Sequence, residues 1–359
     1  MIKYKIYKKK KKKIFFLYLV SCLIFIGFFL KIFITFYSKQ FVKTHFIDEY
    51  ILSKYSQEIR YDQFYLLEKN KTLFDTYLFC TSACLVMNPN SLTKNSNGFN
   101  LSLGAGQISD YLKYFKWILK NKSTPKNIFI GLEFYSLSNN PFMKFTPHEV
   151  EDNILSKIRN LYLDVSFEKF LISKFILGYD TQLNKDELKK LNFAKNGSRL
   201  FSKYFERKND KSLFNKHIEK IKNEKISSFV DEISSSEFAK FNELLDLARK
   251  NNISVSVFFI PIHVSHLTWR KGSIFNDEIK LIKKIFDKTP IETITYFNNF
   301  NEINKNMNFY EHDLTHMNYD AARLIEADLI NKTNNTGMLI SRNELNSKIL
   351  ELKKQHENY

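Results

Sequence analysis

Short apolar runs alternate with amphipathic runs along most of the chain, and this alternation limits the possible fold more than any other feature. The apolar runs are rich in strand-forming residues, and the runs between them repeat apolar residues at helical spacing. We expect strands at residues 76–79, 99–103, 127–134, 253–261 and 294–297, and helices at residues 107–120, 236–250, 275–288 and 319–331. This order is typical of a parallel sheet covered by helices on both faces. We therefore predict an α/β fold, a three-layer sandwich with a mostly parallel sheet of about five strands.

The predicted α/β domain covers residues 73–331. Residues 141–235 interrupt the alternation, because they are polar and rich in helix-forming sequence, and we expect them to form an insertion over one end of the sheet. Residues 38–72 are polar and aromatic and are interpreted as a helical stalk. Residues 332–359 are interpreted as a polar C-terminal tail with a weak, loosely packed helix at 341–354.

Candidate functional residues follow the expected strands. In an open parallel sheet, ligands bind beyond the carboxyl ends of the strands. The residues with suitable chemistry that come after the five strands in turn are Ser82, then Gly104 and Gly106, then Glu133, then His263 and His266, and finally Asp313 and His316. If the fold is as predicted, these groups converge on one rim of the sheet.

Serine, histidine and aspartate together can perform acyl chemistry. A serine hydroxyl is a poor nucleophile until a base removes its proton. His316 is the candidate base for Ser82, and Asp313 would fix the tautomer of its imidazole ring. The backbone N–H groups of Ser82 and of Gly104 or Gly106 could stabilise an oxyanion, because glycine allows close approach of the backbone.

The same three side chains also have a purely structural interpretation. Ser82 can cap the helical turn that follows the first strand. Asp313 can cap a turn near the last helix, with His316 solvated on the surface. For Ser82 taken alone the structural interpretation is preferred, and only the family resemblance given below, together with the order of the elements, favours the catalytic one.

The remaining rim residues are assigned to substrate contact or to structure. Glu133 can be a buried, hydrogen-bonded residue at a strand end. His263 and His266 are spaced i,i+3 and could bind zinc with Glu133 or Glu311. No third ligand is close to the two histidines in sequence, which favours contact with substrate or water instead. We therefore predict no metal, and we predict no cofactor because the segment "NLSLGAG" lacks the lysine of a phosphate-binding loop and the spacing of a dinucleotide fingerprint.

With these residues in place, the chain resembles the SGNH (GDSL-type) hydrolase superfamily over roughly residues 73–331. That family has a serine just after its first strand, a glycine after its second and Asp-x-x-His near its C-terminus. Within it, the chain looks most like the membrane-anchored extracytoplasmic branch that includes alginate O-acetylation proteins and the D-alanine transfer protein of teichoic acid modification. The resemblance implies that Ser82 is the nucleophile, Asp313 the orienting acid and His316 the base, with Gly104 or Gly106 as the glycine of the second block.

Two positions depart from the family pattern. The first block usually opens with glycine, as Gly-x-Ser, whereas this chain has Cys80 in "CTS". The third block usually supplies an asparagine to the oxyanion hole, whereas this chain has Glu133. A carboxylate there would repel a developing oxyanion unless it is protonated or turned away. These departures keep open a second hypothesis, a non-catalytic glycan-binding or assembly scaffold with the same fold.

The N-terminus has the composition of a membrane anchor. Six consecutive lysines (8–13) precede residues 14–37, where Lys31 is the only charged residue among 24 positions. About 20 apolar residues span the hydrocarbon core of a bilayer, and lysine-rich flanks remain cytoplasmic. We therefore predict a single-pass anchor, a cytoplasmic N-terminus and an extracytoplasmic domain, at the periplasm or cell surface, with the lipid bilayer as a partner.

Two other interpretations of this segment are less favoured. The apolar core of a cleaved signal peptide has only about 7–15 residues, and this run is longer. "LVSC", which ends at Cys22, resembles a lipoprotein cleavage box, but the apolar run continues well past Cys22.

Net charge bears on whether the protein binds nucleic acid, and cysteine content bears on whether it contains a disulfide. The net charge is +17, but eight lysines lie within the first thirteen residues, and no basic, aromatic-interleaved RNA-binding motif occurs, so we predict no nucleic-acid partner. Cys80 and Cys84 can pair outside the cytoplasm, and two buried thiols remain an equally good interpretation.

The function predicted from the sequence is that of a membrane-anchored extracytoplasmic O-acyltransferase or esterase acting on a cell-surface or exported polysaccharide. Ser82 would attack an acyl ester, and a sugar hydroxyl or water would accept the acyl group. The acyl donor would come from a separate membrane partner, because free acyl-CoA is not available outside the cytoplasm.

Overall fold

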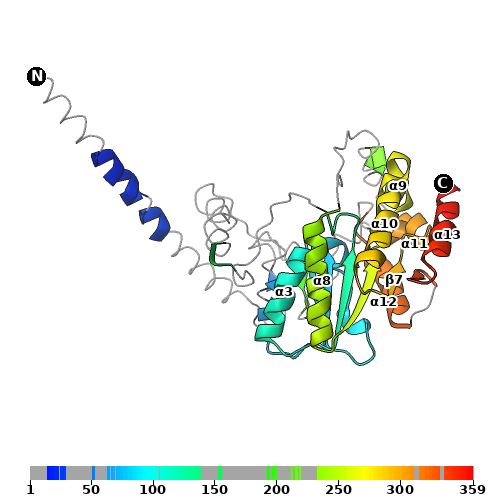
Figure 1. Ribbon diagram of the computed structural model, residues 1–359, viewed down its shortest axis with the longest axis horizontal. Coiled ribbons are helices and arrows are strands. Elements are labelled where there is room, and N and C mark those ends of the chain that lie inside the picture. The colour runs from blue at the N-terminus through cyan, green and yellow to red at the C-terminus, as the bar shows by residue number, and fades with distance from the viewer. Residues whose placement is uncertain are drawn as a thin grey trace, which may run out of the picture.

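A computed structural model describes the fold of most of the expected domain (Figure 1). The described residues are 14–23, 25–29, 51–52, 63–64, 66–68, 70–104, 106–138, 153–155, 192–194, 196–199, 212, 215–216, 218–219, 233–310, 315–331 and 335–358. Most of the predicted insertion at 141–235 lies outside these residues, as do parts of the predicted anchor and stalk.

A six-stranded, mostly parallel sheet forms the centre of the domain. Its strands, in chain order, are β2 (Thr76–Thr81), β3 (Gly98–Leu103), β4 (Asn127–Leu132), β6 (Ser254–Phe259), β7 (Thr293–Tyr296) and β8 (Met338–Ser341). The spatial order is β3-β2-β4-β6-β7-β8, and only the β7–β8 pair is antiparallel. The prediction of an α/β fold with a mostly parallel sheet is therefore confirmed.

The helices cover both faces of this sheet. The longer ones are α3 (Ile108–Asn121), α8 (Ser235–Lys250), α10 (Trp269–Lys288), α12 (Tyr319–Asn331) and α13 (Leu345–Glu357). The shorter ones are α9 (Val264–Leu267) and α11 (Glu302–Lys305). Figure 1 shows α3 and α8 side by side in front of the strands, with α10 next to them.

Alternation of side chains along the strands builds a separate apolar cluster on each face. Tyr77 and Phe79 of β2 point into the larger cluster, which packs against α3, α8, α10 and α13. Leu78 and Cys80 point into the second cluster, which packs against α12 and the loop after β2. A period of two along a strand places neighbours on opposite faces, so both faces of β2 are buried.

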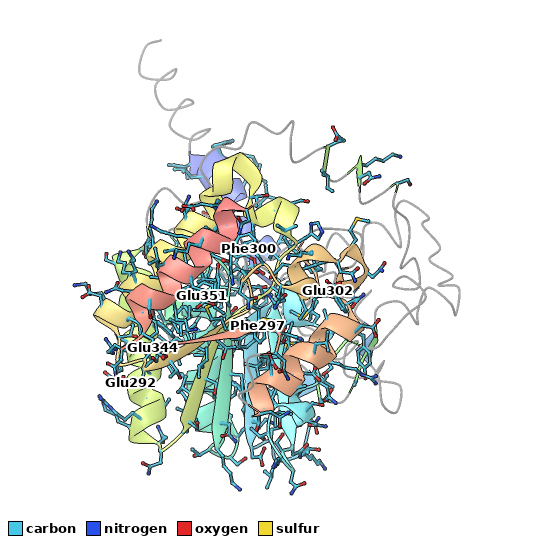
Figure 2. All side chains as sticks on the ribbon, turned by 90° about the vertical axis from the view of Figure 1, so that its right-hand side faces the viewer. Glu292, Phe297, Phe300, Glu302, Glu344 and Glu351 are labelled. Carbon is cyan, nitrogen blue, oxygen red and sulfur yellow. A yellow bond between two sulfur atoms is a disulfide. The ribbon has the colours of Figure 1, made fainter. Side chains whose placement is uncertain are left out.

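The C-terminal segment extends the sheet beyond the boundary at residue 331 that the sequence suggests. Residues 332–359 were expected to be a polar tail, but β8 pairs with β7 from Thr293↔Ser341 to Tyr296↔Met338. Helix α13 follows and buries Ile349 and Leu352 in the larger cluster. Figure 2 shows α13, marked by Glu344 and Glu351, lying along the side of the domain. This segment adds a sixth strand to the five that were expected.

The structure also describes several short segments outside the six-stranded sheet. Residues 63–68, assigned from the sequence to the stalk, bury Phe64 and Leu67 against α3. A two-residue strand β1 (Ile51–Leu52) pairs antiparallel with β5 (Asn192–Phe193).

The residues described between 14 and 29 are helical and expose their apolar side chains. In the part of the chain that the structure describes, no helix is both long and apolar enough to cross a membrane.

A fully buried carboxyl group lies beneath the last parallel strand. Glu278 of α10 accepts hydrogen bonds from the Tyr296 hydroxyl (2.8 Å) and from Nδ2 of Asn298 (3.0 Å). Burial raises the pKa of Glu278 to about 8, although both hydrogen bonds favour the charged form. Glu278 is therefore largely protonated in the folded protein at neutral pH.

This shift predicts a pH-dependent stability. A carboxyl group whose pKa is higher in the folded state contributes stability at low pH, and this contribution is lost between its unfolded value of about 4.5 and about 8. The free energy of unfolding should therefore fall more steeply in wild type than in Glu278→Gln over pH 5–8, by up to about 1.4 kcal/mol per pH unit. Denaturant titrations of both proteins across this range measure the difference. Parallel pH profiles would contradict it.

Candidate active site

Ser82 lies in a tight turn immediately after β2, the second strand of the sheet in spatial order. The strand ends at Thr81, and a 3₁₀ turn, η2 (Ser82–Cys84), follows directly. The turn is closed by the amide of Leu85, which donates to the Ser82 carbonyl at 3.2 Å. The chain leaves β2 toward β3 on one side and later leaves β3 for β4 on the other side of β2. Ser82 therefore lies at the point where the winding of the sheet reverses, the usual ligand site in open α/β sheets.

His316 is held at the start of α12 by the residues that follow it. Met317 is buried and forms an antiparallel bridge with Tyr310. Asn318 accepts hydrogen bonds from the amides of Asp320 (3.0 Å) and Ala321 (3.1 Å), which caps the N-terminus of α12. These two anchors fix the backbone from which the His316 ring projects.

The structure brings Ser82 and His316 together. Ser82 Oγ lies 2.9 Å from His316 Nε2, although the residues are 234 positions apart in the chain. This distance is within hydrogen-bonding reach of a nucleophile and its general base. The N-cap of the turn after β2 is Thr81, which accepts from the Ala83 amide, and Asn318 caps α12, while the capping role considered for Asp313 lies outside the described residues. The hydroxyl and the imidazole are thus directed at each other, with the adjacent helical turns capped by their neighbours.

The other nitrogen of His316 faces a hydroxyl group. Thr315 Oγ1 lies 3.4 Å from His316 Nδ1. If Ser82 donates to Nε2, then Nδ1 carries the proton and Thr315 can accept it. Asp313, predicted as the orienting acid, lies outside the described residues, as does Glu311, so the third member of the predicted triad stays a prediction.

The register between β2 and β3 places one glycine beside the nucleophile. Thr81 pairs with Leu103, so Ser82 and Gly104 are each one residue beyond the last pair. A Cβ on Gly104 would meet no described atom within 4 Å, so this position faces open space. The amide of Gly106 donates to the Leu103 carbonyl at 3.0 Å. Of the two glycines predicted to serve an oxyanion, Gly104 is therefore the one level with Ser82 in the strand register, and the oxyanion role of either glycine and of the Ser82 amide stays a prediction.

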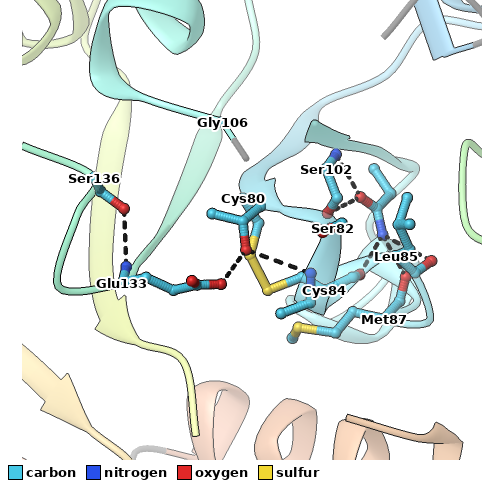
Figure 3. The surroundings of a disulfide bond; sticks show 12 residues. Cys80, Ser82, Cys84, Leu85, Met87, Ser102, Gly106, Glu133 and Ser136 are labelled. Atoms are coloured by element: carbon cyan, nitrogen blue, oxygen red, sulfur yellow. Dashed lines mark hydrogen bonds between the residues drawn. A yellow bond between two sulfur atoms is a disulfide. The ribbon is translucent and has the colours of Figure 1, made fainter. Parts of the chain in front are cut away.

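Glu133 lies at the end of β4 and binds the residue before the nucleophile. Its carboxylate accepts a hydrogen bond from the Thr81 hydroxyl, and its amide donates to Ser136 Oγ at 2.9 Å (Figure 3). The pKa of the Tyr135 phenol is raised. The main cause is the burial of Tyr135, and the charge of Glu133 and a hydrogen bond to its side chain add to it. Glu133 is itself buried, so its carboxylate is held by the protein between two hydroxyl groups. A role of Glu133 in substrate binding stays a prediction.

The contact between Thr81 and Glu133 gives a prediction for stability. In Thr81→Val the Ala83 amide loses its acceptor and the buried Glu133 carboxylate loses a donor, so we expect a loss of about 2 kcal/mol in the free energy of unfolding. Thr81→Ser retains the hydroxyl and should cost less than about 1 kcal/mol. Urea unfolding of both variants measures the difference. Equal losses would show that the hydroxyl group does not stabilise this end of the strand.

Cys80 and Cys84 form a disulfide on either side of the turn. Their Cα atoms are 6.0 Å apart, and both residues are fully buried. Figure 3 shows the bond beneath the turn that carries Ser82. The two interpretations left open by the sequence are thus resolved in favour of pairing, and Cys22 is the free cysteine.

His263 and His266 lie at the far side of the same rim, after β6. Nδ1 of His263 accepts from the Ser265 amide at 3.2 Å, and its Nε2 lies 3.3 Å from the Lys305 carbonyl. Burial lowers the pKa of His263 to about 4, although the hydrogen bond to that carbonyl opposes the shift, so the ring is neutral at pH 7. His266 is half-buried on α9. Among the described residues, no group of three or more His, Cys, Asp or Glu side chains is placed to hold a metal ion.

Sequence reasoning missed Asn100, which supports the nucleophile turn from β3. Nδ2 of Asn100 donates to the carbonyls of Cys84 and Met87, both at 2.9 Å. Its Oδ1 accepts from the amide (2.9 Å) and the hydroxyl (2.5 Å) of Ser102. Figure 3 labels three of the partners of Asn100, namely Ser102, Cys84 and Met87, around Ser82. Asn100 is fully buried, and the loop that covers it is the one that follows the nucleophile.

No known protein-family model matches this chain, and a search of curated proteins finds no match either. The function therefore has to be inferred from the site.

Proposed function

We propose that this protein is a membrane-anchored, extracytoplasmic O-acyltransferase or esterase with a flavodoxin-like, SGNH-type three-layer domain, acting on a cell-surface or exported polysaccharide. The observation that carries the proposal is the 2.9 Å contact between Ser82 Oγ and His316 Nε2 at the switch point of the sheet. Serine and imidazole in this arrangement are the working pair of acyl-transfer enzymes.

The reaction would proceed in two steps. His316 takes the proton of Ser82 while Oγ attacks the carbonyl carbon of an acyl ester, and the same imidazole then protonates the leaving alcohol. A sugar hydroxyl or a water molecule next gives its proton to His316 and attacks the acyl-enzyme, the bond between the acyl carbon and Oγ breaks, and His316 returns the proton to Ser82 Oγ. The amides of Ser82 and Gly104 are the candidate donors to the oxyanion in both steps.

The location and the partners follow from the N-terminal segment. The lysine-rich start and the apolar run at 14–37 support a single-pass anchor with the domain outside the cytoplasm. The exposed apolar side chains between residues 14 and 29 suit a lipid environment. Acyl groups would then be delivered by a membrane-bound partner.

A second candidate function is a non-catalytic glycan-binding or assembly scaffold. The observation that favours it is Glu133, which stands where the resembled family has an oxyanion-binding asparagine. In this chain the Glu133 carboxylate accepts from the Thr81 hydroxyl instead. The two candidates differ in whether Ser82 forms a covalent intermediate.

Pre-steady-state kinetics with p-nitrophenyl acetate test the proposed function in the full-length protein in detergent. An acyl-enzyme mechanism predicts a burst of about one p-nitrophenol per active site and an acetyl group on Ser82 by peptide mass spectrometry. Adding acetyl-acceptor oligosaccharides should accelerate turnover and yield acetylated sugar if the protein is a transferase. Hydrolysis that is unaffected by sugar would assign it as an esterase. No burst and no acetylated serine would favour the scaffold.

A further inference from the structure

The Cys80–Cys84 disulfide encloses the candidate nucleophile. Ser82 is the central residue of the segment that this bond closes into a ring. Cys80 belongs to strand β2 and Cys84 ends the turn η2. The bond therefore joins the turn that carries Ser82 back to the strand from which it emerges.

Each end of this bond is fixed by the surrounding core. A Cβ on Gly131 of β4 would lie 2.6 Å from Cys80 Sγ and 2.9 Å from a ring carbon of Phe258, so only glycine leaves room for the sulfur there. At the other end, the Cys84 carbonyl accepts a hydrogen bond from Asn100 Nδ2 at 2.9 Å. The disulfide thus connects two points that are each fixed by the sheet.

Two hydrogen bonds within the turn are weaker restraints than this covalent bond. The Ala83 amide lies 3.3 Å from Thr81 Oγ1, and the Leu85 amide lies 3.2 Å from the Ser82 carbonyl, both at or beyond the long end of the usual range. The contact of Ser82 with His316 depends on a position set by this turn. A displacement of a catalytic group by about 1 Å can reduce the rate about 10²-fold.

We propose that the Cys80–Cys84 disulfide is a positioning element for Ser82, so that the disulfide form is the active form and the dithiol form is impaired. This inference rests on the proposed function. A dithiol reductant would supply two electrons and two protons to the disulfide, giving two cysteine thiols and leaving the reductant as its own disulfide. Disulfides persist outside the cytoplasm and are rare inside it, so acyl transfer would be restricted to the compartment in which the polysaccharide is found.

The test compares full-length wild type, the double variant Cys80→Ala/Cys84→Ala and the control Cys22→Ala, which removes the remaining cysteine. The readouts are the second-order rate of labelling by a fluorophosphonate and the kcat and KM for p-nitrophenyl acetate. We expect the double variant to keep a cooperative thermal transition while labelling and kcat fall about 10- to 100-fold. KM should change less than about threefold, because the acyl pocket itself is unaltered. Cys22→Ala should behave as wild type.

If the double variant does not fold, wild type treated with a dithiol replaces it. Labelling should then fall in proportion to the fraction of protein with two additional free thiols, at unchanged circular dichroism. Equal labelling rates with and without the disulfide would overturn the inference while leaving the proposed function intact. Wild type that is not labelled at all would overturn the proposed function, and the inference with it.

Discussion

Replacing Ser82 with alanine is expected to reduce p-nitrophenyl acetate hydrolysis by the full-length protein about 10³-fold or more, and His316→Ala is expected to do the same. The physical reason is that the hydroxyl lacks nucleophilicity without a base, and the base has no role without the hydroxyl. Since the two groups act as one unit through their 2.9 Å contact, the double variant Ser82→Ala/His316→Ala should be no slower than either single variant.

Two substitutions away from the site serve as matched controls. Ser96 donates to backbone carbonyls in the loop before β3, and His356 of α13 stacks on Phe275 of α10. Ser96→Ala and His356→Ala remove the same functional groups and should keep activity within about twofold of wild type. Activity that persists in Ser82→Ala would show that this serine is not the nucleophile.

Replacing Asn100 with aspartate is expected to destabilise the protein by about 3 kcal/mol or more. The carboxylate would put an oxygen where Nδ2 now donates to the Cys84 and Met87 carbonyls, and it would place a charge in a fully buried site. Both changes act on the loop directly after Ser82. The free energy of unfolding from denaturant titration is the measurement.

Asn298 provides the matched control for this substitution. It is equally buried and donates to the Ile260 carbonyl and to Glu278, so Asn298→Asp should also cost several kcal/mol. At a temperature where both variants are folded, only Asn100→Asp should slow labelling of Ser82, because Asn298 donates to the Ile260 carbonyl and to Glu278 rather than to the loop after Ser82. A stability of Asn100→Asp within about 0.5 kcal/mol of wild type would contradict the role assigned to this network.

The regular elements could be predicted because their hydrophobic patterns are strong. The expected strand at 99–103 is β3 (Gly98–Leu103), and the expected helix at 319–331 matches α12. The strand β8 could not be recognised, since "MLIS" offers only four positions within a polar segment. Its pairing partner β7 lies more than 40 residues earlier, so the stability of β8 comes from tertiary contact.

The candidate site could be predicted in part for a similar reason. Ser82 and His316 could be identified as candidates because each comes after a strand that the sequence pattern predicts. Asn100 was missed because the pattern "GFNLSL" alternates, with Phe99 and Leu101 on one face, and such alternation usually directs the polar residues to solvent. In this protein the loop after Ser82 covers that face, so Asn100 is buried and its amide is used inside the fold. A local pattern does not contain that information.

Peptide mapping after fluorophosphonate treatment of the full-length protein is the sharpest test of whether Ser82 is an activated nucleophile. If His316 activates Ser82, then Ser82 is the single labelled residue, and the label is lost in His316→Ala as well as in Ser82→Ala. Labelling of Ser82 at an unchanged rate in His316→Ala, or no label on Ser82 in wild type, would rule out a Ser82 nucleophile activated by His316.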